Sequence, residues 1–491
     1  MNAVERLLGP EALARFGGRT AFLFGAEALS YAALAGRVRG AAEAYARLGV
    51  APGDRVLILL RDSPRYAVAW LGAVWLGAVA IGLNTKLGDA DLRYVVEDSG
   101  ARLLVSEPCL VRDLGLATVD IDTIDSGPGE ADAHRGPADR PAFWLYSSGT
   151  TGRPKGVIHA HRAILSSGQA QREVLGLVET DRVLTTSKLF FAYALEHGLL
   201  GPLTFGGCSI LNADWAEPEA VVELVRRESP TAFFSVPSFY RALLAMPASR
   251  LEPFRGVRRF AAAGERLPEP IVSAWRGATG GEIHSIYGMS ETYAVSLVTR
   301  PGTSTGRHTG LPLPGVDARL ESLDGSPVAA GDSGELWVRH PALALGYANR
   351  PEQTQAQFRD GWFRTRDLFS IDGDGHYVHE GRSDELLKVA GQWVKPAEIE
   401  QAASGVPGVT DAACVPFADA NGLERVALFV CASGSAIAAA DAVQAACERQ
   451  LARHERPKLI RVVPELPRTA TGKIQRFRLR ELLARDGTPS A

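Results

Sequence analysis

Hydrophobic and polar residues alternate along the first half of the chain in two ways, one typical of helices and one typical of buried strands. After Ser30, which can cap a helix, apolar residues recur at helical spacing as far as Gly49, where the helix can end. The apolar run at residues 55–60 then predicts a buried strand, and a Ser-Pro pair at residues 63–64 predicts the next helix. This repeated alternation predicts an α/β fold with a mostly parallel, helix-covered sheet.

The alternation resumes after residue 180 and predicts a second α/β subdomain. The runs expected to form strands lie at residues 182–185, 207–211, 231–236, 259–263 and 282–287. Near residues 306–381, short strands and turns predict a small β-barrel-like subdomain. Residues 382–491 predict a compact α+β domain, with strands at 412–415 and 426–430 and a helix at 442–454. We therefore expect an N-terminal domain of residues 1–381 and a C-terminal domain of residues 382–491, divided near Asp384.

Composition and charge argue against several classes of protein. The chain has 491 residues, of which 46% are hydrophobic and 22% charged, so it is long enough for about three folding units. The net charge of −3 gives no basic field, and we expect neither nucleic acid nor a membrane as a partner. The longest apolar run, residues 70–83, is too short to span a bilayer. Five widely spaced cysteines without a C-x-x-C pair, and no secretory signal, predict a reduced, cytoplasmic protein without structural zinc.

One short loop, with the sequence Y-S-S-G-T-T-G-R-P-K-G at residues 146–156, lies between two predicted strands. Its glycines let backbone amides approach an anion, its hydroxyls add donors, and its lysine adds positive charge. The loop therefore predicts a polyphosphate site with the candidate donors Ser147, Ser148, Gly149, Thr150, Thr151, Gly152 and Lys155. It lacks the Gly-Lys-Ser/Thr order of a P-loop, which argues against a kinase or P-loop ATPase. The alternative is a polar surface hairpin, because the same residue types are common in turns.

Four other stretches carry candidate polar groups. Glu291, in the run Y-G-M-S-E-T at residues 287–292, can hold Mg²⁺ against a phosphate; the alternative is a helix start in which Ser290 is the cap. Asp367 can accept hydrogen bonds from both hydroxyls of a ribose, with Arg382 as a nearby donor. Lys473 follows a Thr-Gly pair. Taken alone, Asp367, Arg382 and Lys473 are each more commonly solvated surface residues.

Together these motifs resemble those of the adenylate-forming superfamily, which comprises acyl- and aryl-CoA ligases, adenylation domains and beetle luciferases. The resemblance covers essentially the whole chain, because the motifs follow one another in the family's order. They are residues 146–156, A-A-G-E at 262–265, residues 287–292, G-E at 334–335, Asp367, G-R-S-D at 381–384 and T-G-K at 471–473. The resemblance implies a large N-terminal domain of two α/β subdomains and a β-rich part, followed by a small mobile C-terminal domain whose hinge is Asp384.

Within the superfamily the chain looks most similar to benzoate-CoA ligases, through K-L-F-F-A-Y at residues 188–193, K-V-A-G-Q-W-V at 388–394 and T-A-T-G-K-I-Q-R-F at 469–477. This resemblance implies Lys473 as the adenylating lysine, Glu291 as the Mg²⁺ carboxylate, and Asp367 and Arg382 as ribose contacts. The other implied nucleotide contacts are Gly264, Glu265, Ser285, Ile286, Tyr287, Gly288 and Thr292. The implied ring pocket is lined by Ala192, Tyr193, Gly288, Tyr293 and Ala294, and the implied CoA tunnel by Gly391, Gln392 and Trp393.

The resemblance also implies a reaction. An aromatic carboxylate attacks the α-phosphate of ATP to give an acyl-AMP and pyrophosphate, and coenzyme A then takes the acyl group as a thioester. ATP, Mg²⁺ and coenzyme A are the implied cofactors and co-substrates, the partners are small molecules, and a homodimer is left open. The alternative with the same first step is a stand-alone aryl acid adenylation enzyme that loads a carrier protein.

Two positions depart from the family's pattern. Arg366 stands beside Asp367 where relatives commonly have a glycine. Ala294, preceded by Tyr293, stands where benzoate-CoA ligases commonly have a histidine. The second departure implies an altered ring pocket, suited to a substituted benzoate.

Overall fold

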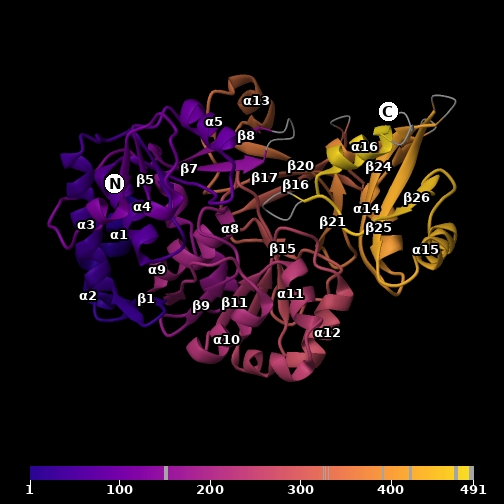
Figure 1. Ribbon diagram of the computed structural model, residues 1–491, viewed down its shortest axis with the longest axis horizontal. Helices are drawn as coiled ribbons and strands as arrows, with labels where there is room; N and C mark the ends of the chain where they lie inside the picture. Colours follow the sequence, from indigo (N-terminus) through magenta and orange to yellow (C-terminus); the bar gives the residue numbers. More distant parts are fainter. Residues whose placement is uncertain are drawn as a thin grey trace. The chain divides into compact units, whose positions relative to one another are not determined.

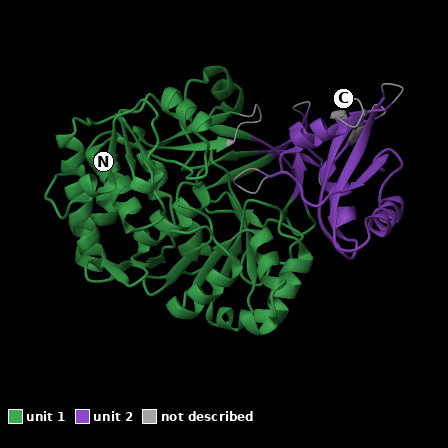
Figure 2. Ribbon diagram, in the orientation of Figure 1, with its two compact units in different colours: residues 1–319, 337–364, 372–378 green, residues 320–336, 365–371, 379–491 purple. Residues whose placement is uncertain are grey.

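The fold is known from a computed structural model, which describes residues 1–148, 153–323, 326, 328–329, 331–389, 392–419, 423–468 and 474–485 (Figure 1). The chain divides into two compact units (Figure 2). The larger unit contains residues 1–319, 337–364 and 372–378, and the smaller contains residues 320–336, 365–371 and 379–491. None of the helices in the described ranges combines the length and hydropathy needed to cross a bilayer.

A seven-stranded sheet forms the first layer of the larger unit. In order across the sheet, its strands are β18 (Gly346–Tyr347), β8 (Pro154–Ala160), β7 (Pro141–Ser148), β4 (Val79–Gly82), β3 (Arg55–Leu59), β5 (Leu103–Ser106) and β6 (Thr118–Asp120). Val56 and Ile58 share a buried core with helices α3 (Tyr31–Arg47) and α4 (Pro64–Leu76). Leu57 and Leu59, on the opposite face, pack with α5 (Asp89–Ser99). Both faces of β3 are covered, so its residues 56–59 are all apolar.

A nine-stranded sheet forms the second layer. In order, its strands are β15 (Leu311–Pro312), β14 (Leu297–Val298), β13 (Ile283–Tyr287), β12 (Arg259–Ala262), β11 (Ala232–Ser235), β9 (Arg182–Thr185), β10 (Cys208–Ile210), β1 (Thr20–Phe24) and β2 (Glu27–Ser30). Helices α10 (Pro218–Glu228), α11 (Pro237–Leu244) and α12 (Glu269–Thr279) share a core with one face. The strands β9 to β13 pair in parallel, so their carboxyl ends meet at one edge.

The remaining elements form smaller sheets. A five-stranded sheet contains β16 (Asp317–Glu321), β17 (Gly334–Arg339), β19 (Phe358–Arg359), β20 (Trp362–Ile371) and β21 (Tyr377–Arg382). The smaller unit also contains β22 (Leu387–Val389), β23 (Gln392–Val394), β24 (Val409–Ala418), β25 (Glu424–Ala432) and β26 (Leu459–Val462). Its helices are α14 (Pro396–Ser404), α15 (Ala436–Gln450) and α16 (Arg476–Arg485). Strands β24 to β26 pack with α14 and α15 around one apolar core.

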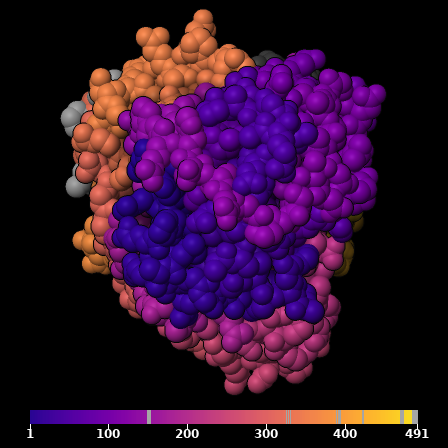
Figure 3. Space-filling model, turned by 90° about the vertical axis from the view of Figure 1, so that its left-hand side faces the viewer, coloured from indigo at the N-terminus to yellow at the C-terminus, as the bar shows by residue number. Residues whose placement is uncertain are grey.

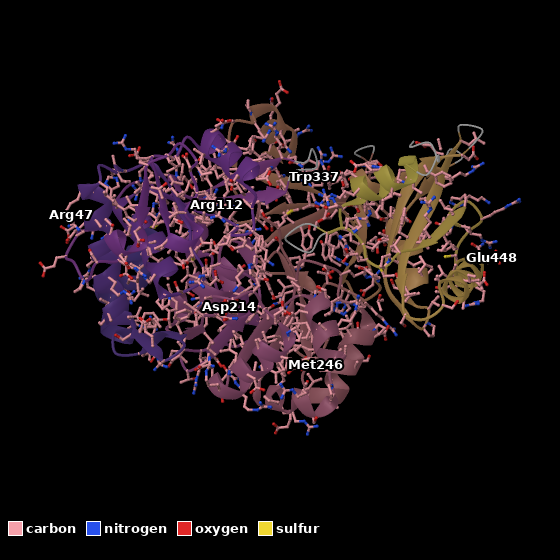
Figure 4. All side chains as sticks on the ribbon, viewed as in Figure 1. Arg47, Arg112, Asp214, Met246, Trp337 and Glu448 are labelled. Carbon is pink, nitrogen blue, oxygen red and sulfur yellow. The ribbon has the colours of Figure 1, made fainter. Side chains whose placement is uncertain are left out.

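Most charged side chains lie at the surface, as expected for a folded chain. The indigo N-terminal segments form a continuous part of the outer surface (Figure 3). Exposed side chains such as Arg47 and Glu448 point away from the ribbon (Figure 4).

Of the five cysteines, Cys109 is exposed and the other four are buried, and none is in a disulfide.

The α/β class predicted from the sequence is confirmed. Ser30 and Ser63 cap α3 and α4 through their side chains, as their positions indicate. The five runs predicted as strands of the second subdomain correspond to β9, β10, β11, β12 and β13. The helix predicted at residues 442–454 is wrong at both ends, because it begins at Ala436 and ends at Gln450. Its first turn is alanine-rich, and alanine favours a helix without a capping signal.

The departure at Arg366 has a backbone explanation. Arg366 lies within β20 with a φ of 62°, in the left-handed region that favours glycine. A side chain in that region crowds its own carbonyl and is disfavoured by about 1–2 kcal/mol. Relatives with glycine at this position avoid that strain, whereas this chain retains it beside Asp367.

Arg366→Gly should raise the free energy of unfolding by about 0.5–1 kcal/mol. The gain is smaller than the strain because glycine also loses about 0.5–1 kcal/mol through its greater freedom in the unfolded chain. Urea titration monitored by tryptophan fluorescence measures the change. Arg359→Gly is the matched control, since Arg359 is an exposed strand residue without a positive φ and should only lose stability. Equal destabilisation by both substitutions would contradict the strain at Arg366.

Candidate active site

The carboxyl ends of three parallel strands bring the predicted adenine-contacting residues together. Ser235 in β11, Ala262 in β12 and Ser285 in β13 are in register across the sheet. Ile286 and Tyr287 end β13, and the segments that follow β12 and β13 carry Gly264, Glu265 and Gly288. Gly264 has a φ of 87°, which a glycine adopts without strain. Ligands of open α/β sheets bind at this edge, so the geometry suits a nucleotide.

The flanks of the predicted phosphate loop form an antiparallel hairpin. Strands β7 and β8 pair from Pro141 opposite Ala160 to Ser148 opposite Pro154, and Ser147 lies opposite Lys155. The hairpin holds both ends of the loop, as the apolar runs on either side predict. The hydroxyl of Ser147 is buried and has no hydrogen-bond partner within the described part of the chain.

Lys155 and Glu291 form a buried ion pair. The Lys155 Nζ atom lies 2.7 Å from Glu291 Oε1, and their side chains are only 15% and 7% exposed. Lys155 comes from β8 of the seven-stranded sheet, whereas Glu291 lies in the turn after β13 of the nine-stranded sheet. The residue predicted to position phosphate and the residue predicted to hold Mg²⁺ are therefore neighbours.

Tyr347, which the sequence motifs do not indicate, completes this pair. Its hydroxyl oxygen accepts from Lys155 Nζ at 3.1 Å and lies 2.7 Å from Glu291 Oε1 and 2.5 Å from Gln357 Oε1, the two acceptors for its proton. The ammonium also lies 4.2 Å from the centre of the tyrosine ring, a cation–π contact. Tyr347 is on the two-residue strand β18, which pairs with β8. In the sequence, only the Gly-Tyr pair at residues 346–347 indicates this strand.

The charge of Glu291 is stabilised in this setting. Burial raises the pKa of its carboxyl, but the Lys155 ammonium and the hydrogen bonds from Lys155 and Tyr347 together outweigh burial, so the pKa lies below its ordinary value. His159 Nε2 lies 2.8 Å from the carbonyl oxygen of Ser290 and so fixes the adjoining turn. Burial lowers the pKa of His159 to about 4, so its ring is neutral and structural near pH 7.

The alternative interpretation of Glu291 as part of a helix start is wrong. Residues 290–292 form a turn, in which the backbone N–H groups of Thr292 and Tyr293 both donate to the carbonyl of Met289. The chain then enters β14 instead of a helix. The turn contains no helix N-terminus for Ser290 to cap.

The predicted ring-pocket residues come from two segments of the larger unit. Ala192 and Tyr193 lie in the short helix α8 (Ala192–Ala194), and the Tyr193 hydroxyl donates to the carbonyl of Ala261 at 3.3 Å. Gly288 approaches Ala294 so closely that an added Cβ atom would lie 3.1 Å from the Ala294 carbonyl oxygen. Tyr293 is buried with a φ of 58°, and its hydroxyl lies 2.9 Å from Ser167 Oγ. Tyr293, which precedes the second departure at Ala294, is therefore strained and tightly held.

The predicted ribose contacts and hinge residue meet in the smaller unit. Arg382 donates from Nη1 to Asp367 Oδ1 at 2.9 Å, and it binds both carboxylate oxygens of Asp384 at 2.8 and 3.0 Å. Burial opposes the charge of Arg382, but the two carboxylates outweigh burial and raise the pKa of its guanidinium. One arginine thus connects the predicted ribose carboxylate to the predicted hinge.

Several predicted residues lie outside the described part of the chain. They are Gly149, Thr150, Thr151, Gly152, Gly391 and Lys473. The side chains of Ser148, Gln392 and Trp393 are likewise outside it. Their roles therefore stay predictions from the sequence.

Comparison with known proteins identifies the family. The family model described as AMP-binding enzyme matches residues 10–348, and the model for the AMP-binding enzyme C-terminal domain matches residues 398–473. A 3-hydroxybenzoate–CoA ligase from Aromatoleum sp. (strain CIB) is 39% identical, over 98% of this chain and 97% of that protein. A benzoate–CoA ligase from Thauera aromatica is 36% identical, over 98% and 95%.

Solved structures agree with these relatives. A crystal structure of an anthranilate CoA ligase in complex with anthranoyl-AMP has a TM-score of 0.92 at 31% identity and covers 99% of this chain and 98% of that one. A benzoate CoA ligase from Burkholderia xenovorans LB400 has a TM-score of 0.90 at 32% identity, with 98% and 99% covered. The chain belongs to the AMP-binding enzyme family of adenylate-forming enzymes, on the branch of the aryl-CoA ligases.

Proposed function

We propose that the chain is an ATP-dependent aryl-CoA ligase, which activates a benzoate-type carboxylate as its acyl-AMP and then forms the CoA thioester. The observation that carries this proposal is the buried, charged Lys155–Glu291 pair close to the carboxyl edge of β13. Adenylation brings a carboxylate and a polyphosphate together, so the site must offset negative charge by placement and electrostatics. Names of relatives that act on benzoate and its derivatives support the aromatic substrate.

The donor set at Glu291 suits Mg²⁺. The carboxylate is buried and its lowered pKa keeps it ionised near pH 7, and Mg²⁺ in nucleotide sites is commonly held by one or two carboxylates together with substrate phosphates. Glu291 is the residue that would hold the ion, which would then neutralise charge on the phosphates. Lys155 and Tyr347 orient the carboxylate through Oε1.

The remaining residues are assigned by the family's motifs. The hydroxyls and glycines of residues 147–152 and the ammonium of Lys155 bind the β- and γ-phosphates, and Asp367 with Arg382 binds the ribose. Lys473, the last residue matched by the C-terminal family model, neutralises charge at the α-phosphate during adenylation. Rotation about Asp384 would separate the adenylation and thioester steps.

Product analysis tests the reaction class. With benzoate or a hydroxybenzoate, ATP and Mg²⁺, we expect acid-dependent pyrophosphate exchange, and adding CoA should release AMP and the aryl-CoA thioester. Release of ADP instead would contradict adenylation. Offering CoA and an acyl carrier protein side by side distinguishes the ligase from a carrier-loading enzyme, because only the latter acylates the carrier in preference to CoA.

Glu291→Gln should lower the rate of pyrophosphate exchange by about a hundredfold or more and raise the Mg²⁺ concentration for half-maximal rate by about tenfold or more. Glutamine keeps the volume but removes the charge. Tyr347→Phe is the matched control: it removes one hydrogen bond to Glu291 but keeps the ring beside Lys155, so the expected loss is only about two- to tenfold. An unchanged Mg²⁺ requirement in Glu291→Gln would refute the metal assignment.

Lys473→Ala should lower adenylate formation by about a hundredfold to a thousandfold and leave thioester formation from supplied aryl-AMP within about threefold of wild type. The reason is that only the first half-reaction brings two anions together. Rapid-quench assays of each half-reaction measure the two rates. Lys458→Ala, which removes an exposed lysine of the same unit, should change neither. Equal losses in both half-reactions would rule out the assigned role.

A further inference from the structure

A group of buried polar side chains lies beside the two tyrosines assigned to the ring pocket. Glu196 and His197 come from the segment η3 (Leu195–Leu200), and Gln171 comes from η2 (Ala170–Val174). Glu196 is 2% exposed, and the other two are completely buried. Both segments are π-helical turns, which interrupt regular helices and occur frequently at functional sites.

Several polar atoms of this group have no hydrogen-bond partner. Within the ranges that the structure describes, these atoms are Glu196 Oε1, Gln171 Oε1 and both ring nitrogens of His197. The Glu196 carboxyl is nevertheless anchored, because the backbone N–H groups of Gly168 and Val295 donate to it. Gln171 is anchored in turn by its Nε2 bond to the His197 carbonyl at 3.1 Å. Since buried polar atoms without partners are destabilising, such a fixed set is suited to a polar ligand group.

The group is uncharged near neutral pH. Burial raises the pKa of the Glu196 carboxyl to about 8 and lowers the pKa of His197 to about 3. The carboxyl is therefore mostly protonated at pH 7 and the imidazole is neutral. A protonated carboxyl and a neutral imidazole can each donate and accept, which matches a hydroxyl group better than an ionic one.

Both tyrosines of the ring pocket flank this group. The His197 ring stacks on Phe234 at 4.5 Å and meets the Tyr193 ring edge-on at 4.9 Å. Glu196 adjoins the second segment as well, because the backbone N–H of Val295, two residues after Tyr293, donates to its carboxyl. The polar group is thus next to side chains from both segments that line the pocket.

We infer that Glu196 and His197 bind a hydroxyl group on the aromatic ring of the substrate, so that the enzyme prefers hydroxybenzoates to benzoates without a hydrogen-bonding substituent. This inference rests on the proposed aryl-CoA ligase function and names the substrate class of the same site. An apolar pocket discriminates weakly between substituents of similar size, whereas buried partners left unpaired discriminate strongly.

Wild-type enzyme gives the first test. In pyrophosphate exchange, each hydroxybenzoate is compared with the methylbenzoate substituted at the same carbon, because the two substituents are similar in size and only one forms hydrogen bonds. For at least one ring position, kcat/KM for the hydroxyl compound should exceed that for the methyl compound by about tenfold or more.

Variants give the second test, again read as the hydroxyl-to-methyl ratio of kcat/KM. Glu196→Leu and His197→Phe should each lower the ratio by about tenfold or more, whereas Glu196→Gln, which keeps a donor and an acceptor, should retain it within about threefold. Tyr45→Phe is the matched control, since it removes a buried hydroxyl that donates to the carbonyl of Ala69 in α4. A packing role alone would lower both kcat/KM values and leave the ratio in place.

The outcomes separate this inference from the proposed function. Exchange with aromatic acids at a hydroxyl-to-methyl ratio near one in wild type overturns the inference and leaves the ligase function standing. A high hydroxyl-to-methyl ratio in wild type that the Glu196 and His197 variants retain also overturns the inference. It would indicate that these buried side chains bind internal water only. Absence of exchange with every aromatic acid overturns the proposed function itself. A wild-type ratio near one overturns the inference whether or not the variants fold.

Discussion

The pairing of a buried ammonium with a buried carboxylate is the constraint on which the larger unit depends. Lys155 belongs to one sheet and Glu291 to the turn that follows β13 of the other, and their contact is almost completely shielded from water. Removing one partner of such a pair leaves an isolated charge and typically destabilises a protein by about 3–5 kcal/mol. Tyr347 contributes to both partners, so the charges stay satisfied without solvent. The ion pair thereby holds the two sheets together where the proposed nucleotide site lies.

This pairing also explains how the site stays stable before a highly charged substrate binds. In the proposed reaction the ammonium exchanges its carboxylate for a phosphate, and the carboxylate exchanges its ammonium for a metal ion. Neither group has to change its protonation state, since the carboxyl is already ionised. Most of the desolvation of both charges takes place when the protein folds, so substrate binding does not have to supply it.

The sequence predicts the repeated α/β alternation because strands buried on both faces leave continuous apolar runs, such as residues 56–60. It also predicts Glu291 as a candidate through the order of motifs, yet it does not indicate its partner. Tyr347 is 56 residues away from Glu291 and 192 from Lys155, and its strand has only two residues. Local periodicity carries no information about such long-range pairs. The left-handed backbone at Arg366 and Tyr293 is hidden for a related reason, because their residue types do not favour it.

The distribution of the cysteines makes the native chain easy to label. Cys109, in the short helix η1 (Pro108–Leu110) of the larger unit, is exposed, while the other four thiols are shielded from reagents. One cysteine added at an exposed position of α15, such as that of Glu448, would supply a second attachment point in the smaller unit. A donor and an acceptor dye on these two thiols would report whether the separation of the units changes during turnover, with every native cysteine kept.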